Sequence, residues 1–211
     1  MNGFLISTTM NKEYKAFKEF SSQMNFFVNT EKQELNNFTD FTSSLADELR
    51  NLKIQENFTL MEKYKSILIV RNKCKSLPSD LFLRLRTENS SFYDIKRIVP
   101  LDFITKFDEV AIAAFIQKNQ FNGTFKIQFE GRLCPDELRT DLFKIIIPLI
   151  NNKVDLKTPE YVIAIQAFKG LIGLTVMKND SKNFNFSFFA HPNDNCLESH
   201  DKIDELKRKE S

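Results

Sequence analysis

The sequence predicts an α+β protein with two domains in 211 residues. Stretches rich in β-branched and aromatic residues alternate with stretches of helical apolar spacing. The clearest β-rich runs come late, at 162–169 and 170–178, after a polar turn that contains Asp155 and Pro159. The chain is also long enough to bury two small cores. We predict three segments, with domains at 1–95 and 96–190 and a polar tail at 191–211.

The first half is expected to alternate strands and helices. A strand over 3–8 precedes a helix capped by Asn11. Residues 29–38 are rich in Asn, Thr and Glu, so we predict a connecting loop there, and apolar spacing predicts a second helix over 40–52. The remaining expected elements are a buried strand over 66–70 and a helix that opens with Pro78.

The second half is expected to form one sheet with two helices. The spacing of Phe107, Val110 and Phe115 predicts a helix over 103–118. Alternating apolar and polar residues predict a strand, and Pro135 with two acidic neighbours predicts a helix start. The expected order is an extended stretch over 97–100, the helix 103–118, a strand over 124–129, a helix from 135 to 147 and the hairpin 162–178.

Composition excludes some classes of function. Lysine and arginine number 30 against 28 acidic residues, so any site for nucleic acid must come from local clustering and not from the net charge of +2. Phenylalanine is frequent (22 residues) and tryptophan is absent. We interpret most phenylalanines as core residues and not as a platform for stacking bases.

The residues of catalytic and metal sites are sparse. Cys74, Cys134 and Cys196 are far apart, and both histidines, His191 and His200, fall in the polar tail. Five glycines supply no phosphate-binding loop. We therefore predict a protein that is not an enzyme and has no catalytic residue, metal, cofactor or small-molecule substrate. Without a recognisable leader or membrane span, it is expected to be soluble and intracellular.

Cations at predicted strand ends form the candidate site. Side chains from several strand ends can converge on one edge of a sheet and face a phosphate backbone. A solvated rim explains the same residues, and from the residues alone it is the simpler explanation. The candidates are Arg97, Lys126, Arg132, Lys153, Lys157, Lys169, Lys178 and Lys182.

Several motifs occur in the order found in one protein family. The chain resembles the THUMP domain, in the version carried by the adaptor proteins of tRNA cytidine acetylation. The similar segments are Gly3–Thr8 (family G-x-L-x-T-C), Arg97–Pro100 (R-x-x-P), Thr124–Arg132 (a strand ending in a basic cluster), Asn152–Tyr161 (N-K-V-D-L-x-x-P-x-Y) and Lys182–Asn185 (K-Y-N-L). The chain departs from the family at Thr9 and in the thinned basic cluster Glu130–Arg132.

The resemblance implies a ferredoxin-like N-terminal domain followed by an α/β THUMP domain. It also implies a tRNA-binding adaptor that presents tRNA to a separate RNA cytidine acetyltransferase, which forms N4-acetylcytidine in the D-arm region of leucine and serine tRNAs. The implied partners are tRNA and that enzyme, without a membrane. The implied RNA-binding residues are Arg97, Lys126, Arg132, Lys153, Lys169, Lys178 and Lys182.

Two other classes of function stay open at this point. THUMP domains also occur in RNA methyltransferases, thiouridine synthases and pseudouridine synthases, so the chain is alternatively the RNA-binding subunit of another tRNA-modifying enzyme. A protein-interaction module that does not bind RNA is the third possibility. The sequence leaves the choice among nucleolus, nucleus and cytoplasm open.

Overall fold

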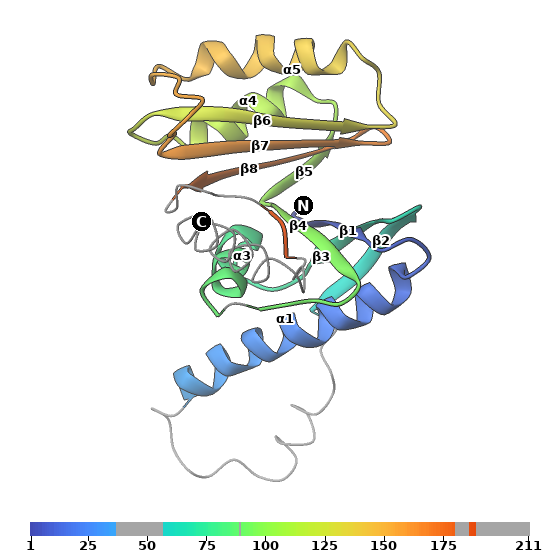
Figure 1. Cartoon of the computed structure of the whole chain (residues 1–211). Coiled ribbons are helices and arrows are strands. Elements are labelled where there is room, and N and C mark those ends of the chain that lie inside the picture. The colour runs from blue at the N-terminus through green and yellow to red at the C-terminus, as the bar shows by residue number, and fades with distance from the viewer. Residues whose placement is uncertain (37–56, 89, 180–185, 189–211) are drawn as a thin grey trace, which may run out of the picture.

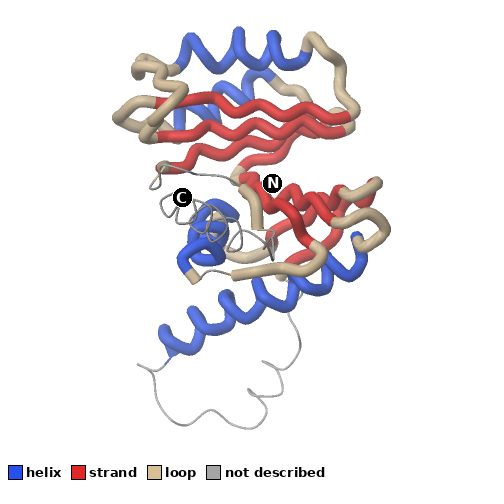
Figure 2. The backbone as a smooth tube through the Cα atoms, in the orientation of Figure 1, coloured by secondary structure: helices blue, strands red, loops and turns tan. Residues whose placement is uncertain are grey.

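The computed structural model describes residues 1–36, 57–88, 90–179 and 186–188. It contains two four-stranded sheets stacked between helices, and this arrangement confirms the predicted α+β class. Figure 1 shows α1 below the first sheet, α3 beside it, and α4 and α5 on the upper side of the second sheet, and the same arrangement is visible in the tube of Figure 2. Within the described residues, no helix is long and apolar enough to cross a bilayer.

The first sheet has the order β2-β3-β1-β4, and all its neighbouring strands are antiparallel. With two helices on one side, this is the ferredoxin-like β-α-β-β-α-β arrangement. The structure thus bears out the N-terminal fold that the resemblance implied. Its elements are β1 (Gly3–Thr8), α1 (Glu13–Asn36), β2 (Phe58–Tyr64), β3 (Ile67–Asn72), α3 (Pro78–Thr87) and β4 (Ile95–Leu101).

Strand alternation divides the first sheet into two faces. On β1, Phe4 points toward α1, where its ring lies 5.1 Å from that of Phe20. Phe20 also contacts Phe58 of β2, with 5.5 Å between the ring centroids. All three rings are buried, so aromatic packing holds α1 to the sheet. The intervening residues, including Leu5, face the second sheet.

The second sheet has the order β5-β8-β7-β6. Strands β6 and β7 are parallel, whereas β7 with β8 and β8 with β5 are antiparallel. The parallel pair needs a crossover, which α5 provides. The elements are β5 (Phe103–Lys106), α4 (Glu109–Lys118), β6 (Phe125–Arg132), α5 (Leu138–Ile146), the 3-10 turn η1 (Ile147–Leu149), β7 (Tyr161–Phe168) and β8 (Leu171–Lys178).

Several predicted boundaries are wrong. The helix predicted over 103–118 begins only at Glu109, because Phe103–Lys106 pairs with β8 and Asp108 caps the helix by accepting a hydrogen bond from the Ala111 N–H at 3.0 Å. The loop predicted over 29–38 is helical up to Asn36, since α1 continues through it. The helix predicted over 40–52 lies outside the described residues.

Two further differences concern strands and helix starts. Strand β2 was not predicted, because its charged and exposed residues hide the apolar pattern. Asn11, the predicted cap, has a left-handed backbone (φ 61°) in the turn before α1. The chain passes from the first sheet to the second between Leu101 and Phe103.

The two sheets share one apolar core. Leu101 and Ile104, at the passage between the sheets, belong to the same buried cluster as the first sheet, and so do Ala164, Phe168 and Met177 of the second. Gly173 lets the sheets approach, because a Cβ at this position would lie 2.6 Å from a methyl carbon of Leu101. The chain then returns to the first sheet: Ile98 donates its N–H to the Phe186 carbonyl at 3.0 Å.

Asp102 joins the two sheets by hydrogen bonds. The backbone N–H of Ser79, in the first turn of α3, donates to Oδ1 at 2.9 Å, and Thr175 Oγ1 on β8 donates to Oδ2 at 2.6 Å. Burial raises the pKa of the Asp102 carboxyl above its ordinary value of 3.8, although the bonds from Thr175 and Ser79 act in the opposite direction. The folded protein therefore binds a proton at Asp102 more tightly than the unfolded chain does.

This raised pKa predicts a pH-dependent stability. The contribution of Asp102 is fully present below its unfolded pKa of 3.8 and is lost as pH rises through the higher folded pKa. The variant Asp102→Asn keeps the size of the side chain and does not titrate. We expect wild type to lose stability relative to the variant as pH rises, measured by urea unfolding from about pH 3 to pH 7. If the difference in the free energy of unfolding between wild type and Asp102→Asn does not change with pH, the prediction is wrong.

Candidate nucleic-acid interface

The predicted cations occupy two opposite ends of the second sheet. Arg132 ends β6, and Lys169 lies in the turn from β7 to β8. Three lysines lie at the other end, near the starts of β6 and β7. These start-end lysines are Lys126, Lys153 and Lys178. Strand β6 has eight residues, so the two ends are roughly 23 Å apart at about 3.3 Å per residue. The expected single edge is therefore not formed.

Lys169 is held beside the first sheet by aromatic contacts. Its Nζ lies 4.5 Å from the centroid of the Tyr64 ring and 5.9 Å from that of Phe168. The Tyr64 and Phe168 rings are themselves 6.0 Å apart. Lys169 and Gly170 both have positive φ angles, as a tight two-residue hairpin turn requires. A cation is thus fixed where the two sheets meet.

Further cations gather at this end that the sequence analysis did not select. Tyr64 ends β2 and is followed by Lys65 in the turn to β3, so hairpin turns from both sheets lie side by side. Lys106 ends β5 and pairs in register with Leu171, directly after the Lys169 turn. All of these cations are exposed to solvent. The group is named the turn-end cations and comprises Lys65, Lys106, Arg132 and Lys169.

Arg97 lies in the seam between the sheets and is neutralised there. Its Nη1 donates to both carboxylate oxygens of Glu130 on β6, and its guanidinium stacks over Phe186 at 5.3 Å. The two charged side chains are 19% and 28% exposed. Because an ion pair cancels the charge that a phosphate would meet, Arg97 is a poorer contact for RNA than the turn-end cations.

Two buried polar atoms beside this ion pair have no partner among the described residues. Gln166 is the register neighbour of Glu130, and its Nε2 makes no hydrogen bond. Ser7 is the register neighbour of Arg97, and its Oγ is equally unpartnered. The seam is therefore a polar strip within an otherwise apolar contact between the sheets.

The polar turn before β7 is a structural element. Asp155 accepts hydrogen bonds from the N–H groups of Thr158 at 2.9 Å and Lys157 at 2.8 Å, and from the Thr158 hydroxyl at 3.0 Å. These bonds lower the pKa of the Asp155 carboxyl, the one from the Thr158 N–H most strongly. Asp155 thus shapes the loop that carries Lys153 and Lys157. Lys182 lies outside the described residues.

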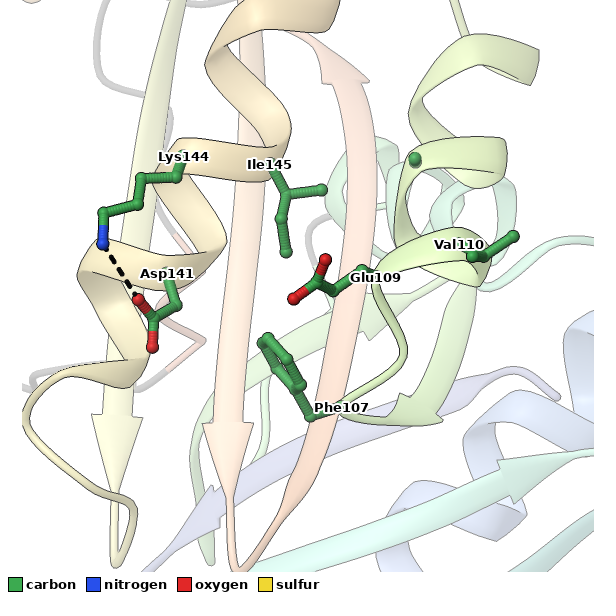
Figure 3. A pocket seen from close by; sticks show the side chains of 7 residues that line it. Phe107, Glu109, Val110, Asp141, Lys144 and Ile145 are labelled. Carbon is green, nitrogen blue, oxygen red and sulfur yellow. Dashed lines mark hydrogen bonds and ion pairs between the residues drawn. The ribbon is translucent and has the colours of Figure 1, made fainter.

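A hollow is lined in part by Phe107, the residue directly after Lys106. It measures about 700 Å³ and is open to solvent between α4 and α5, where Phe107, Glu109 and Ile145 point toward one another (Figure 3). In its lining, Lys144 Nζ forms an ion pair with Asp141 at 3.3 Å. In the described part of the chain, no three His, Cys, Asp or Glu side chains come close enough to bind a metal ion.

Comparison with known proteins gives distant structural likenesses. No family model and no curated protein matches the sequence. One solved structure that it resembles is PH1313 from Pyrococcus horikoshii, with 14% sequence identity and a TM-score of 0.48 over 85% of this chain and 56% of that one. Another is TrmN from Thermus thermophilus, with 12% identity and a TM-score of 0.43 over 82% of this chain and 44% of that one. A third is a 4-thiouridine synthetase in complex with RNA and ATP, with 12% identity and a TM-score of 0.41 over 84% of this chain and 42% of that one. The chain spans about half the length of these proteins.

The seam ion pair makes a testable contribution to stability. Removing either partner leaves a mostly buried charge, so the single variants Arg97→Gln and Glu130→Gln should each be destabilised, and the double variant by less than their sum. We expect a coupling energy of roughly 1–2 kcal/mol in a double-mutant cycle of urea unfolding. The exposed pair of Lys144 and Asp141 is the matched control, with a coupling of about 0.5 kcal/mol or less. Equal coupling in both cycles contradicts a structural role for the seam pair.

Proposed function

We propose that this chain is a THUMP-type protein that binds tRNA and presents it to a separate RNA cytidine acetyltransferase. The product would be N4-acetylcytidine in the D-arm region of leucine and serine tRNAs. The order of the THUMP-like motifs supports the family, and the ferredoxin-like unit before a second α/β unit agrees with the arrangement that the family implies. The acetylation step is the finer part of the proposal and rests on the resemblance alone.

One observation carries the RNA-binding part of this proposal: exposed cations from both sheets converge beside an aromatic ring. Lysine and arginine bind phosphates, and a half-exposed tyrosine next to them offers a surface on which a base can stack. Tyr64 is 36% exposed and borders Lys65 and Lys169. The start-end lysines, about one strand length away, would meet a second stretch of the same RNA. A free nucleotide cannot bridge that distance, whereas a folded RNA can.

Charge reversal tests the RNA surface. Replacing Lys65, Lys106 and Lys169 with Glu should weaken tRNA binding by at least about tenfold and flatten the slope of log affinity against log salt by up to about 2, at roughly 0.7 per lost phosphate contact. Thermal stability should change little, because these side chains are exposed. Binding is measured by filter retention at several salt concentrations.

The control for this experiment makes the same change of charge elsewhere. Arg71, Lys73 and Lys75 are exposed residues at or just after the end of β3, away from the β2–β3 turn, and reversing them should leave the affinity nearly unchanged. A third variant reverses the charges of the start-end lysines Lys126, Lys153 and Lys178. Its loss of tRNA affinity shows whether the bound RNA also contacts that end of the sheet. Equal affinities of the wild type and the Lys65, Lys106 and Lys169 variant would exclude the turn-end surface.

The role as an adaptor is tested by reconstitution. The chain alone, incubated with tRNA and acetyl-CoA, S-adenosylmethionine or ATP, should leave the tRNA unmodified. Addition of an RNA cytidine acetyltransferase should yield N4-acetylcytidine, detected by mass spectrometry of nucleosides, and depletion of the protein from cells should remove it. Loss of a different modified nucleoside on depletion would instead identify the chain as a subunit of another tRNA-modifying enzyme.

A further inference from the structure

Strand β6 lies at the edge of the second sheet, and its outer side is open. Along a strand, alternate residues direct their N–H and C=O groups to opposite sides. Thr124 bonds inward, since its carbonyl accepts from the Tyr161 N–H, and Phe125 bonds outward. Ile127 and Phe129 therefore direct their backbone groups away from β7, and no hydrogen bond to them from any described residue is present on that side. The edge offers a short ladder for another strand.

The chain itself demonstrates how a strand is added at this edge. Phe125 donates its N–H to the Lys153 carbonyl at 3.0 Å and accepts from the Asp155 N–H at 2.9 Å. Val154 thereby forms a parallel bridge with Phe125. The turn at Asp155 then leads this segment away, so pairing stops before Ile127. The open stretch begins where the chain's own contribution ends.

The surroundings of the open stretch are apolar on one side and basic on the other. Toward α5, the Phe129 ring lies 6.4 Å from that of Phe143. Phe143 also lines a shallow hollow of about 610 Å³ on α5, where Ile147 is 50% exposed. On the opposite face, Lys126 and Arg132 flank the stretch. The hollow is lined by Arg139, Thr140, Phe143, Lys144, Ile147 and Pro148.

Charge decides what kind of strand fits. Glu130 forms an ion pair with Arg97, and Asp141 with Lys144. Among the described residues, no ion pair is present at Lys126, Arg132 or Arg139. A second copy of this chain is disfavoured, because antiparallel pairing centred on Phe129 would set Lys126 opposite Arg132. A strand with acidic residues on one face and apolar residues on the other complements both sides of the edge.

We propose that the outer edge of β6 binds an extended segment of a partner protein by strand addition, and that this segment alternates apolar and acidic residues. The apolar side chains lie against Phe129 and Phe143, and the acidic side chains face Lys126 and Arg132. The backbone groups of Ile127 and Phe129 supply the ladder. This surface shares Arg132 with the turn-end cations and Lys126 with the start-end lysines, but its ladder consists of backbone groups of β6, and its function does not depend on RNA binding.

Amide exchange gives a direct test on the wild-type chain. A short synthetic peptide of alternating valine and glutamate should slow hydrogen exchange at the amides of Ile127 and Phe129, monitored by NMR. The matched peptide of alternating valine and lysine should not. Absence of protection, or equal protection by both peptides, overturns the proposal. Protection that appears with protein concentration alone indicates a second copy, protection by tRNA indicates a nucleic-acid surface, and either result also overturns it.

A pair of variants separates the ladder from side-chain packing. Ile127→Pro removes one outward N–H without touching the bonds to β7, and proline is tolerated at such edge positions. Ile127→Ala removes the side chain and keeps the N–H. We expect at least about tenfold weaker binding of the valine–glutamate peptide in Ile127→Pro than in Ile127→Ala, with circular dichroism as the check of folding. Equal affinities in the two folded variants would contradict strand addition, and if the proline variant does not fold, the exchange experiment decides.

Discussion

A single residue between two strands fixes the architecture of this protein. Strand β4 of the first sheet ends at Leu101 and β5 of the second begins at Phe103, so only Asp102 joins them. With no loop to act as a hinge, the sheets are stacked directly: Leu101 packs against Gly173, and the Asp102 carboxylate bonds α3 to β8. The buried carboxylate costs free energy of desolvation, which its two hydrogen bonds and the shared apolar core offset.

This stacking creates surfaces that neither sheet has alone. The β2–β3 turn and the β7–β8 turn lie together, and Tyr64, Phe168 and Lys169 pack across the boundary between the sheets. The same stacking neutralises Arg97 by setting it against Glu130 in the seam. A protein with a net charge of only +2 thereby gains a locally basic end.

The proposed functions use different chemical groups, although both include Arg132 and Lys126 of β6. The turn-end cations come from loops and strand ends, where side chains are free to follow an RNA backbone. The β6 edge instead offers fixed backbone groups, which suit an extended polypeptide. One sheet can thus bind RNA at its end and a protein along its margin. Such an arrangement suits a protein whose proposed role is to hold a substrate for another enzyme.

The sequence by itself determined the strongly patterned elements. The strand at 3–8, the helix from Pro78 and the hairpin 162–178 were predicted because their periodicity and turn residues are local properties. Tertiary structure decided the rest. Phe103–Lys106 is a strand because it pairs with β8, and β2 is a strand because it pairs with β3. Likewise, the sequence selected Arg97 and Lys169 alike as cations, but only packing pairs Arg97 with Glu130 and leaves Lys169 exposed beside Lys65, because such contacts join residues far apart in the chain.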